Sequence, residues 1–360
     1  MRVVVAMSGG VDSSVAALRL REAGHEVLGV FLRNGVVAES AIGPTRGCCS
    51  VRDACDAEEV AGRLDIPFYS LDHSREFGRI VDDFVAEYAA GRTPNPCVQC
   101  NRELKFGELM RFADTVGAEA VASGHYARLE VVNGRPVLRR AVDLGKDQSY
   151  VLATSERDSM ARVLFPLGEL QKPEVRALAE RAGLAVHDKV ESQDICFIPS
   201  GDHRDLLRRK RPELFRSGPI VDREGRVLGQ HGGAVGFTVG QRRGIGLGGN
   251  GPFYVLETDP ESNVVTVGRR EELPLFRAEL RAVQWWIPTP CSEGEGLEVT
   301  AQLRAHHAGD PARVLCSGDR VELEFAQGAV VVPGQIGVLY DGDRVVAAGT
   351  MGQAVAANGR

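Results

Sequence analysis

Two cysteines in the segment NPCVQCN, Cys97 and Cys100, are residues whose type and spacing could do chemistry. A third thiol, Cys196, lies in the segment ESQDICFIP. A structural zinc site needs four ligands, and the sequence offers no second Cys-x-x-Cys or spaced histidine pair to complete one. Three interpretations remain open: a redox pair, a catalytic thiol that works with Cys196, and three thiolates that hold an iron–sulfur cluster with one iron open to hydrosulfide.

The segment VVVAMSGGVDSS is a candidate phosphate-binding loop between a short apolar run and a helical pattern. Gly9 and Gly10 let the backbone turn tightly and approach an anion, and Ser8 and Ser13 add hydroxyl donors where the helix begins. The segment matches neither the GxxxxGK(S/T) loop nor the GxGxxG fingerprint. An SGGxDS pattern directly after a first strand is typical of the PP-loop of ATP pyrophosphatases. In that setting Asp12 could help to hold Mg²⁺ beside the polyphosphate.

The other cysteines carry weaker signals. Cys48 and Cys49 are adjacent in a long loop, where packing of the loop is favoured over a functional role. Cys55, Cys291 and Cys316 each stand alone, and a lone cysteine is most often a small buried hydrophobic residue. We therefore expect no disulfide framework in this chain.

The first 130 residues alternate strand and helix patterns, which predicts a parallel sheet covered by helices on both faces. Loops at the carboxyl ends of such strands usually face a nucleotide, and we expect the Cys97 and Cys100 segment among them. Strands are predicted at 2–6, 26–32, 67–71 and 118–123, and helices at 12–23, 53–64, 77–90 and 104–116.

The pattern changes further along the chain. The segment ARLEVVNGRPVLRR predicts a β-hairpin on an Asn-Gly turn, and 172–182 has helical periodicity. From about residue 218 the sequence is rich in glycine, and after about residue 275 it consists of short strand patterns. Closely spaced short strands indicate a small barrel or sandwich at the C-terminal end.

Composition limits the cellular setting. The net charge of −6 argues weakly against a dedicated nucleic-acid-binding protein, although a local basic face remains compatible with it. No apolar run reaches the roughly 18 residues that a membrane span needs, and the N-terminus lacks the features of a signal peptide. We therefore expect a cytoplasmic protein with no membrane partner.

A set of ordered motifs makes the sequence similar to the tRNA-specific 2-thiouridylases. The motifs are SGGVDSS, GCCS, TPNPCxxCN, ASGHYA, KDQSYVL, FPLGELQKPEVR, ESQDICFIP and HGGAVGFTVGQRRGIGLGG, and a weaker likeness continues through PGQIGVLYDGD. The resemblance implies an α/β fold of three domains: a PP-loop ATP pyrophosphatase domain with the catalytic cysteines at 1–205, a small central tRNA-binding domain at 206–273 and a C-terminal β-barrel at 274–360. It implies a tRNA-uridine 2-sulfurtransferase that thiolates the wobble uridine at position 34.

The resemblance also implies roles for individual residues. Adenylation would turn the uracil 2-oxygen into a leaving group, Cys196 would carry persulfide sulfur, and Cys100 would be the nucleophile. The implied ATP-binding residues are Ala6, Met7, Ser8, Gly9, Gly10, Val11, Asp12 and Ser13, with Leu32 and Gly124 around the adenine and ribose. The implied tRNA contacts are Asn95, Pro96, His125, Lys146, Asp147, Gln148, Arg304 and Gln335, of which Asn95 and Pro96 would touch the target base. The implied cofactors are ATP and Mg²⁺; the implied partners are the wobble-uridine tRNAs for Lys, Glu and Gln and, as sulfur donor, a cysteine desulfurase or a sulfur-relay protein.

Two positions depart from the family pattern. Cys97 stands where the best-studied members of the family have an aspartate, and it completes a three-thiolate pattern with Cys100 and Cys196. A [4Fe–4S] cluster and a persulfide scheme with a transient disulfide are therefore both open. Ala305 follows Arg304 where the family usually has Arg-Tyr, so that an aromatic tRNA contact is missing there and His306 could stack instead.

Basic residues cluster in the segment RDLLRRKRP. Arg204, Arg208 and Arg211 would share one helix face and could grip phosphates. Two other functions compete with tRNA thiolation. One is a small-molecule PP-loop ligase of the argininosuccinate- or GMP-synthetase type, which needs no paired cysteines. The other is a non-catalytic RNA-binding or sulfur-carrier protein.

Overall fold

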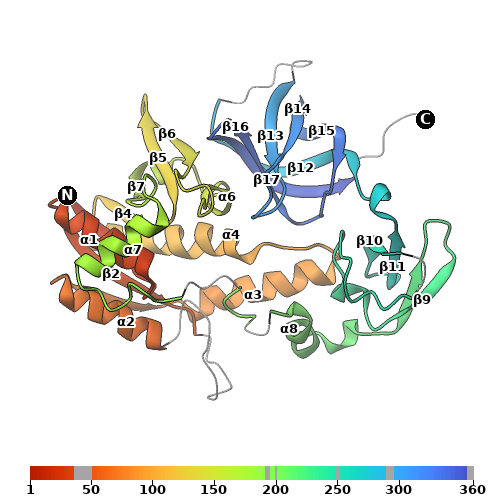
Figure 1. The fold of residues 1–360 in the computed structure, drawn as a ribbon, viewed down its shortest axis with the longest axis horizontal. Helices are drawn as coiled ribbons and strands as arrows, with labels where there is room; N and C mark the ends of the chain where they lie inside the picture. Colours follow the sequence, from red (N-terminus) through yellow and green to blue (C-terminus); the bar gives the residue numbers. More distant parts are fainter. Residues whose placement is uncertain (36–50, 191–194, 199–200, 249–250, 289–295, 355–360) are drawn as a thin grey trace. The chain divides into compact units, whose positions relative to one another are not determined.

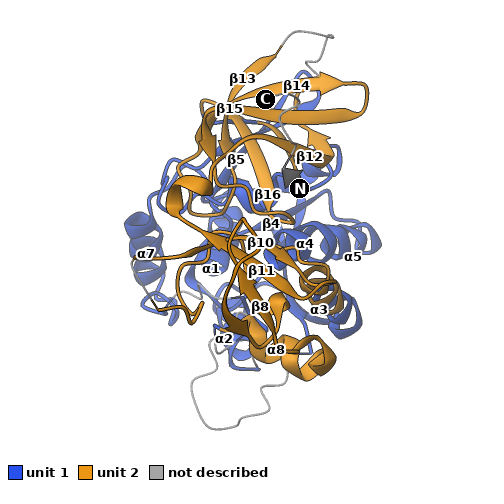
Figure 2. Cartoon of the chain, turned by 90° about the vertical axis from the view of Figure 1, so that its right-hand side faces the viewer, with its two compact units in different colours: residues 1–81, 96–201, 343–345 blue, residues 82–95, 202–342, 346–360 orange. Residues whose placement is uncertain are grey.

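The computed structural model describes residues 1–35, 51–190, 195–198, 201–248, 251–288 and 296–354. The chain divides into two compact units (Figure 2). Unit 1 comprises residues 1–81, 96–201 and 343–345, and unit 2 comprises residues 82–95, 202–342 and 346–360. Among the described residues, no helix is long and apolar enough to cross a membrane. Cys48, Cys49 and Cys291 lie outside the described residues.

A five-stranded parallel sheet forms the centre of unit 1, in the order β3-β2-β1-β4-β7. Its strands are β1 (Arg2–Ala6), β2 (Glu26–Arg33), β3 (Phe68–Asp72), β4 (Ala120–Ser123) and β7 (Val163–Leu164). The chain leaves β1 for β2 on one side, whereas β4 lies on the other side of β1. The carboxyl end of β1 is therefore the topological switch point, where open α/β sheets bind ligands.

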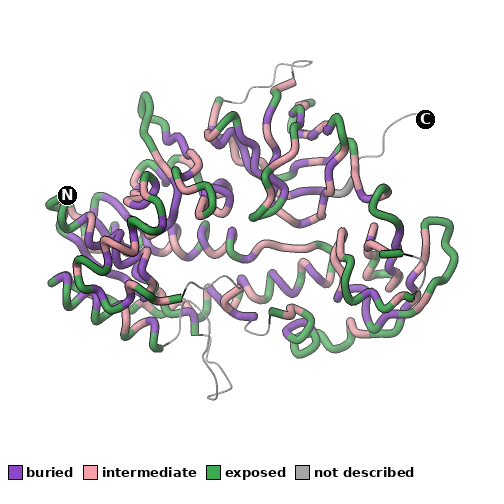
Figure 3. The backbone as a smooth tube through the Cα atoms, in the orientation of Figure 1, coloured by how far each residue is buried: buried purple, intermediate pink, exposed green. Residues whose placement is uncertain are grey.

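Helices α1 (Val11–Glu22), α2 (Val51–Arg63) and α7 (Lys172–Arg181) belong to unit 1, whereas α3 (Ser74–Ala89) begins in unit 1 and its residues from 82 onward belong to unit 2 (Figure 1). Helix α1 is buried along most of its length (Figure 3), and its buried residues are apolar or small: Val11, Ser13, Ser14, Val15, Ala16, Ala17, Leu18 and Leu20. Its Val15 shares one hydrophobic core with Val5 of β1, Val60 of α2 and Val175 of α7. Burial of this core fixes the first turn of α1 against the sheet.

An unusual helical run extends from residue 96 to residue 115. It comprises α4 (Pro96–Cys100), a π-helix (Asn101–Glu108) and α5 (Leu109–Thr115). Pro96 occupies the first helical position, where its missing N–H costs nothing. The sequence predicted an ordinary helix over 104–116, and the π-helical turns are the difference. The run leads into β4 at the amino edge of the sheet, which leaves Cys97 and Cys100 at the opposite end of the run.

Between β4 and β7 the chain forms the predicted hairpin and a short helix, α6 (Ser149–Leu152). Strands β5 (Ala127–Val132) and β6 (Arg135–Arg140) pair antiparallel across Asn133 and Gly134, whose φ angles of 52° and 75° suit the Asn-Gly turn. Asp343 accepts hydrogen bonds from Arg128 and Arg139 at 2.6 and 2.8 Å. These ion pairs attach segment 343–345 to the hairpin.

Unit 2 contains two sheets. Helix α8 (His203–Lys210) precedes a four-stranded sheet in the order β10-β11-β8-β9, formed by β8 (Gly218–Val221), β9 (Val227–His231), β10 (Tyr254–Asp259) and β11 (Val264–Gly268). The second sheet has the order β12-β15-β14-β13-β16-β17, and β12 also pairs with β17. Its strands are β12 (Leu275–Trp285), β13 (Leu297–Gln302), β14 (Asp310–Ser317), β15 (Arg320–Ala329), β16 (Ile336–Asp341) and β17 (Arg344–Ala354). Pairing of the first strand with the last closes this sheet into a barrel.

The predicted fold class is confirmed: an α/β chain with a parallel-sheet PP-loop domain, a small central domain and a C-terminal β-barrel. The strands and helices expected in the first 130 residues are present, and their bounds differ from the expected ones by a few residues. The expected domain boundaries at 205/206 and 273/274 stay predictions.

Candidate functional site

The glycine-rich loop joins β1 to α1 at the switch point of the sheet. Gly9 has a φ of +70°, and a Cβ at this position would overlap the main-chain carbonyl of Asp53, so only glycine fits. Gly10 is the N-cap of α1 and brings no side-chain cap to the first-turn amides. The Ser8 amide donates to Ser13 Oγ at 3.1 Å, which keeps the loop curled over the helix start. This is the backbone arrangement that binds phosphate at a helix N-terminus.

Gly124, directly after β4, closes the loop from the other side of the switch point. A Cβ on Gly124 would lie 2.5 Å from the Ser13 nitrogen and 2.6 Å from the Asp12 carbonyl carbon, so the backbones of the two segments touch. Leu32 is half-buried near the end of β2, the neighbour of β1. Both residues predicted to surround the adenosine therefore lie at the carboxyl edge that carries the loop.

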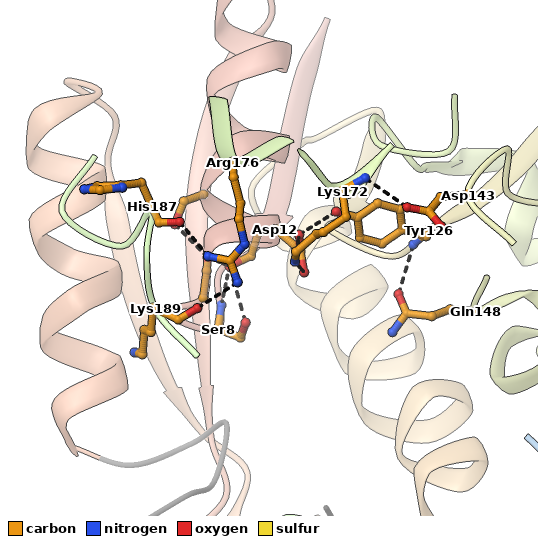
Figure 4. A network of polar contacts seen from close by, with 12 residues as sticks. Ser8, Asp12, Tyr126, Asp143, Gln148, Lys172, Arg176, His187 and Lys189 are labelled. Carbon is orange, nitrogen blue, oxygen red and sulfur yellow. Dashed lines mark hydrogen bonds and ion pairs between the residues drawn. The ribbon is translucent and has the colours of Figure 1, made fainter. Parts of the chain in front are cut away.

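Asp12, in the first turn of α1, is the centre of a polar network (Figure 4). Lys172 Nζ donates to both carboxylate oxygens, at 2.7 and 2.8 Å, and the Tyr126 hydroxyl donates to Oδ1 at 2.8 Å. Lys172 is the first residue of α7, and its own amide donates to Asp143 at 2.9 Å. The carboxylate expected to hold Mg²⁺ is thus bonded to an ammonium group.

A second lysine lies behind the loop. Lys189 Nζ donates to the Gly9 carbonyl at 2.8 Å and to Asp53 Oδ1 at 2.7 Å, and it also pairs with Asp56. Burial alone lowers the pKa of Lys189, but the hydrogen bonds that its ammonium group donates to the carboxylates of Asp53 and Asp56 outweigh it and raise that pKa overall. Lys189 therefore stays charged and ties the loop to the first turns of α2.

Helix α7 also holds the segment that carries Lys189. Arg176 donates to the main-chain carbonyls of His187 and Lys189, at 2.7 and 3.2 Å (Figure 4). Arg176 lies four residues after Lys172, one turn further along α7. The same helix therefore carries Lys172 and holds the segment that contains Lys189.

The KDQSY segment is built into the same network. Asp147 is 5% exposed and accepts bonds from Arg140, from the Ala141 amide and from Ser149 Oγ. Gln148 exchanges two bonds with the backbone of Tyr126, one through its side chain at 2.9 Å and one through its amide at 2.8 Å. Both side chains have structural partners, and the tRNA contacts expected for Asp147, Gln148 and the half-buried Lys146 stay predictions.

The three thiols predicted to act lie in unit 1. Cys97 is exposed, Cys100 and Cys196 are half-buried, and none of the three is in a disulfide. The residue after Cys100, Asn101, is buried and reaches the Val151 carbonyl of α6 at 3.5 Å, while its Oδ1 has no hydrogen-bond partner. Helix α6 follows Gln148 directly, so the sequence around Cys100 is linked to the Asp12 network through α6.

The iron–sulfur interpretation of the three thiols is not tested by the structure. Within the described ranges, no three or more His, Cys, Asp or Glu side chains are grouped as ligands for a metal ion. Cys97, Cys100 and Cys196 all belong to those ranges, and the [4Fe–4S] cluster that the three-thiolate pattern allowed stays a prediction.

His125 lies beside Gly124 but is buried. Its Nδ1 is 2.7 Å from Ser123 Oγ, and its ring packs between Phe106 of the π-helix and Phe165. Here too a structural role is clear, and contact with tRNA stays a prediction.

The remaining predicted tRNA contacts occupy several segments. Gln335 donates its side-chain amide to the Thr93 carbonyl at 2.9 Å, which holds the segment that leads to the half-buried Asn95. Pro96 is buried at the start of α4, and Arg304 is exposed in a turn of the barrel. The structure does not test contact with tRNA at these four positions.

The basic residues in and next to α8 form surface ion pairs and ring contacts. Asp202, the N-cap of α8, accepts bonds from Arg204 that hold the Asp202 pKa at about 2. Arg208 lies 4.5 Å from the Phe215 ring, and Arg211 pairs with Glu213. All three arginines therefore have partners in the structure, and their contact with phosphates stays a prediction.

Two expectations about lone cysteines are wrong. Cys55, on the outer face of α2, is exposed rather than buried, and Cys316 is disulfide-bonded. Sequence reasoning also missed Tyr126, Lys172 and Lys189 as parts of the site. The only sequence signal for them was their place inside the motifs ASGHYA and FPLGELQKPEVR and before ESQDICFIP.

Comparison with known proteins agrees with this geometry. Residues 1–200 match the model of the tRNA methyl transferase HUP domain, residues 204–269 the tRNA methyl transferase PRC-barrel domain, and residues 277–351 the aminomethyltransferase beta-barrel domain. The chain is 48% identical to the tRNA-specific 2-thiouridylase MnmA of Thermobifida fusca, over 98% of this chain and 96% of that protein. It is 42% identical to the tRNA-specific 2-thiouridylase MnmA of Rhodopirellula baltica, over 98% and 97% respectively.

Solved structures are more distant. A 4-thiouridine synthetase–RNA complex with bound ATP is 16% identical over 59% of this chain and 50% of that chain, with a TM-score of 0.38. NMN synthetase from Francisella tularensis is 18% identical over 53% and 65%, with a TM-score of 0.33. At these TM-scores neither likeness supports an inference about this chain.

The models that match residues 1–200 and 204–269 are described as tRNA methyl transferase domains, whereas the relatives are named as 2-thiouridylases, which transfer sulfur. The relatives align with nearly the whole chain, and sulfur transfer gives Cys100 and Cys196 a chemical use that methyl transfer does not require. For these reasons sulfur is the better-supported transferred group.

Proposed function

Because this chain belongs to the family of tRNA-specific 2-thiouridylases, a family of sulfurtransferases that act on tRNA, we propose that it replaces the 2-oxygen of the wobble uridine, position 34, by sulfur. The reaction consumes ATP and yields 2-thiouridine, AMP and pyrophosphate. The observation that carries the proposal is the SGGVDS loop at the switch point of the sheet, in which Gly9 has a positive φ and a Cβ would overlap the Asp53 carbonyl.

The first half-reaction activates the base. The uracil 2-oxygen attacks the α-phosphorus of ATP, and the bond to pyrophosphate breaks, so that the oxygen leaves later as part of AMP. The loop amides and the positive end of α1 bind the phosphates, and Leu32 and Gly124 flank the adenosine. The chain's own groups supply orientation and charge, which is the larger part of catalysis in phosphoryl and nucleotidyl transfer.

Mg²⁺ does not fit at Asp12 in the arrangement described. A single carboxylate is enough when phosphates and water complete the octahedron, but both oxygens of this carboxylate are bonded to Lys172.

The second half-reaction delivers sulfur from a persulfide on Cys196. The Cys100 thiolate attacks the Cys196 sulfur, the S–S bond of the persulfide breaks, and hydrosulfide is released. Hydrosulfide attacks the uracil C2, and AMP leaves with the electrons of the C–O bond. A Cys100–Cys196 disulfide remains, which a dithiol reductant reopens with two electrons. If the terminal sulfur attacks C2 first and Cys100 then releases the base, the products are the same.

Mass spectrometry of tRNA nucleosides tests the proposal. A strain that lacks this protein should lose 2-thiouridine at the wobble position of its tRNAs for Lys, Glu and Gln. The purified protein, with ATP and a cysteine desulfurase or sulfur-relay protein as donor, should restore it on unmodified tRNA. Wobble 2-thiouridine that persists unchanged in the deleted strain refutes the proposal, and so does a mass gain of a methyl group instead of an exchange of oxygen for sulfur.

A further inference from the structure

A loop of unit 2 carries two adjacent, exposed arginines, Arg242 and Arg243. The loop comprises residues 238–248, TVGQRRGIGLG, and precedes β10. Within the described part of the chain, neither guanidinium group forms an ion pair or a hydrogen bond. Neither residue is among those expected to bind ATP or tRNA. Both side chains are therefore available to an external anion.

Other arginines of the same four-stranded sheet have carboxylate partners. Arg226, in the turn between β8 and β9, pairs with Asp222 at 2.6 Å. Arg223, in the same turn, pairs with Glu272 at 3.3 Å. The chain has a net charge of −6, so it holds more carboxylates than cations. Two neighbouring cations without such a partner produce a local positive potential, which attracts anions.

The backbone that carries the two arginines is held by hydrogen bonds on both sides of them. The Gln241 side chain accepts from the Thr238 amide at 3.1 Å and donates to the Arg243 carbonyl at 2.9 Å. Val255 of β10 exchanges two main-chain hydrogen bonds with Gly240 and Gln241, at 2.8 and 2.9 Å. A cation on an ordered backbone loses less conformational entropy on binding than one on a flexible loop.

Apolar residues anchor the end of the same loop. Ile245 is 6% exposed and lies in the hydrophobic core of the four-stranded sheet, and the partly buried Leu247 packs against that core. Because these two side chains point into the sheet, the loop stays on its surface with Arg242 and Arg243 exposed.

The start of the loop contacts the segment that leads to the thiols. Thr93 Oγ1 donates to Thr238 Oγ1 at 3.4 Å, and Thr93 lies two residues before Asn95. Asn95 is expected to touch the target base, so the phosphates of the same RNA strand are the anions closest at hand. The arginines follow Thr238 by four and five residues.

We propose that Arg242 and Arg243 bind phosphate groups of the tRNA backbone. The proposal rests on the tRNA-directed function proposed above and adds two residues that bind the substrate. A guanidinium group suits this task, because it donates two parallel N–H bonds to the oxygens of one phosphate. Phosphate contacts carry no sequence information, so the loop contributes affinity and orientation, and other residues select the wobble uridine.

The salt dependence of tRNA binding tests this role. The affinity of the full-length protein for an unmodified tRNA transcript is measured at a series of salt concentrations. The test variant is Arg242→Gln with Arg243→Gln, and the corresponding double lysine variant keeps both charges. The matched control, Arg223→Gln with Arg226→Gln, removes two charges from the same sheet at ion-paired positions. Thiolation kinetics give the KM values for tRNA and ATP, and thermal unfolding shows that each variant is folded.

The double glutamine variant of Arg242 and Arg243 should bind tRNA about tenfold more weakly at low salt. The slope of the logarithm of Kd against the logarithm of salt concentration should become shallower by about 1 to 2, because up to two phosphate contacts are lost. The KM for tRNA should rise by a similar factor, whereas the KM for ATP and the Tm should not change. The lysine variant should keep most of the salt slope but lose part of the affinity. The control should bind as the wild type does.

Two results overturn the proposal. One is wild-type tRNA affinity and wild-type salt slope in the folded glutamine variant of Arg242 and Arg243. The other is an equal loss in the Arg223 and Arg226 control, which would make the effect one of total charge. A wild-type protein that binds no tRNA, or that binds tRNA without thiolating it, refutes the proposed function itself. The two failures are thereby distinguished.

Discussion

Replacement of Gly9 by alanine is the most direct test of the loop geometry. The residue has a φ of +70°, and an added Cβ would overlap the main-chain carbonyl of Asp53 at the start of α2. A left-handed backbone costs a residue with a Cβ about 1–2 kcal/mol, and the displacement of a main-chain carbonyl adds strain of about 1–3 kcal/mol. We therefore expect Gly9→Ala to destabilise the protein by about 2–5 kcal/mol.

Two control variants separate the contributions. Gly24 also has a positive φ, +79°, but an added Cβ there meets nothing within 4 Å, so Gly24→Ala measures the conformational cost alone. Gly10 has a φ of −99° and its nearest atom would be Ser8 Oγ at 3.7 Å. Gly10→Ala should cost only on the order of 0.5 kcal/mol as a poorer N-cap.

The assay combines thermal unfolding with ATP affinity. About 1 kcal/mol shifts the Tm of a domain of this size by about 2–4 °C, so Gly9→Ala should lower the Tm by on the order of 10 °C. Its ATP affinity should also fall at least tenfold, because the loop must move away from α2. Gly24→Ala should lose stability without losing affinity. If Gly9→Ala keeps both the stability and the ATP affinity of Gly10→Ala, the loop does not have the geometry described.

Three further outcomes are expected. Cys100→Ser should abolish formation of 2-thiouridine while tRNA-dependent release of pyrophosphate continues. Cys55→Ser, a control at an exposed position, should leave both activities unchanged. A Cys100→Ser protein that still thiolates tRNA would rule out the nucleophile role. Gln335→Ala should weaken tRNA binding in a gel-shift assay without changing ATP affinity, because the hydrogen bond from the Gln335 side chain to the Thr93 carbonyl orders the segment before Asn95. A variant with the tRNA affinity of the wild type would contradict this. Asp202→Asn keeps the cap of α8 but removes a carboxylate whose pKa is lowered to about 2, mainly by its hydrogen bond from the Arg204 side chain. Its Tm should therefore lie below that of the wild type by a constant amount above pH about 4, and the difference should vanish as the pH falls from about 4 towards 2; a difference that grows on acidification would reverse the sign of this linkage.

The nucleotide half of the site was predictable because its determinants are local. Two glycines, two hydroxyl residues and a helix start lie within a few residues of one another, and the apolar run of β1 precedes them directly. Alternating strand and helix patterns then require a parallel sheet, and that sheet places the loop at its carboxyl edge. Each of these steps follows from neighbouring residues, and the structure agrees with them.

The cations that support the loop were not predictable in the same way. Lys172 is 160 residues from Asp12 in the sequence, and Lys189 is 180 residues from Gly9. A lysine at the start of a helical pattern ordinarily indicates a solvated position, and nothing local distinguishes one that is buried against a distant carboxylate. Only the tertiary fold, which packs α7 against α1, brings these charges together.

The sulfur half shows a different limit of sequence reasoning. Apolar spacing over 104–116 predicted a helix, and a helix is present, but spacing alone does not separate i+4 from i+5 hydrogen bonding over one or two turns. The π-helical segment begins at the residue after Cys100, where the buried side chain of Asn101 reaches α6. Helix α6 in turn follows Gln148, which holds the backbone of Tyr126, whose hydroxyl bonds to Asp12. Cys100 and the phosphate loop, which are far apart in the sequence, are thus joined by one continuous set of contacts. The π-helix next to Cys100 agrees with this arrangement, because π-helices are rare and occur frequently at functional sites.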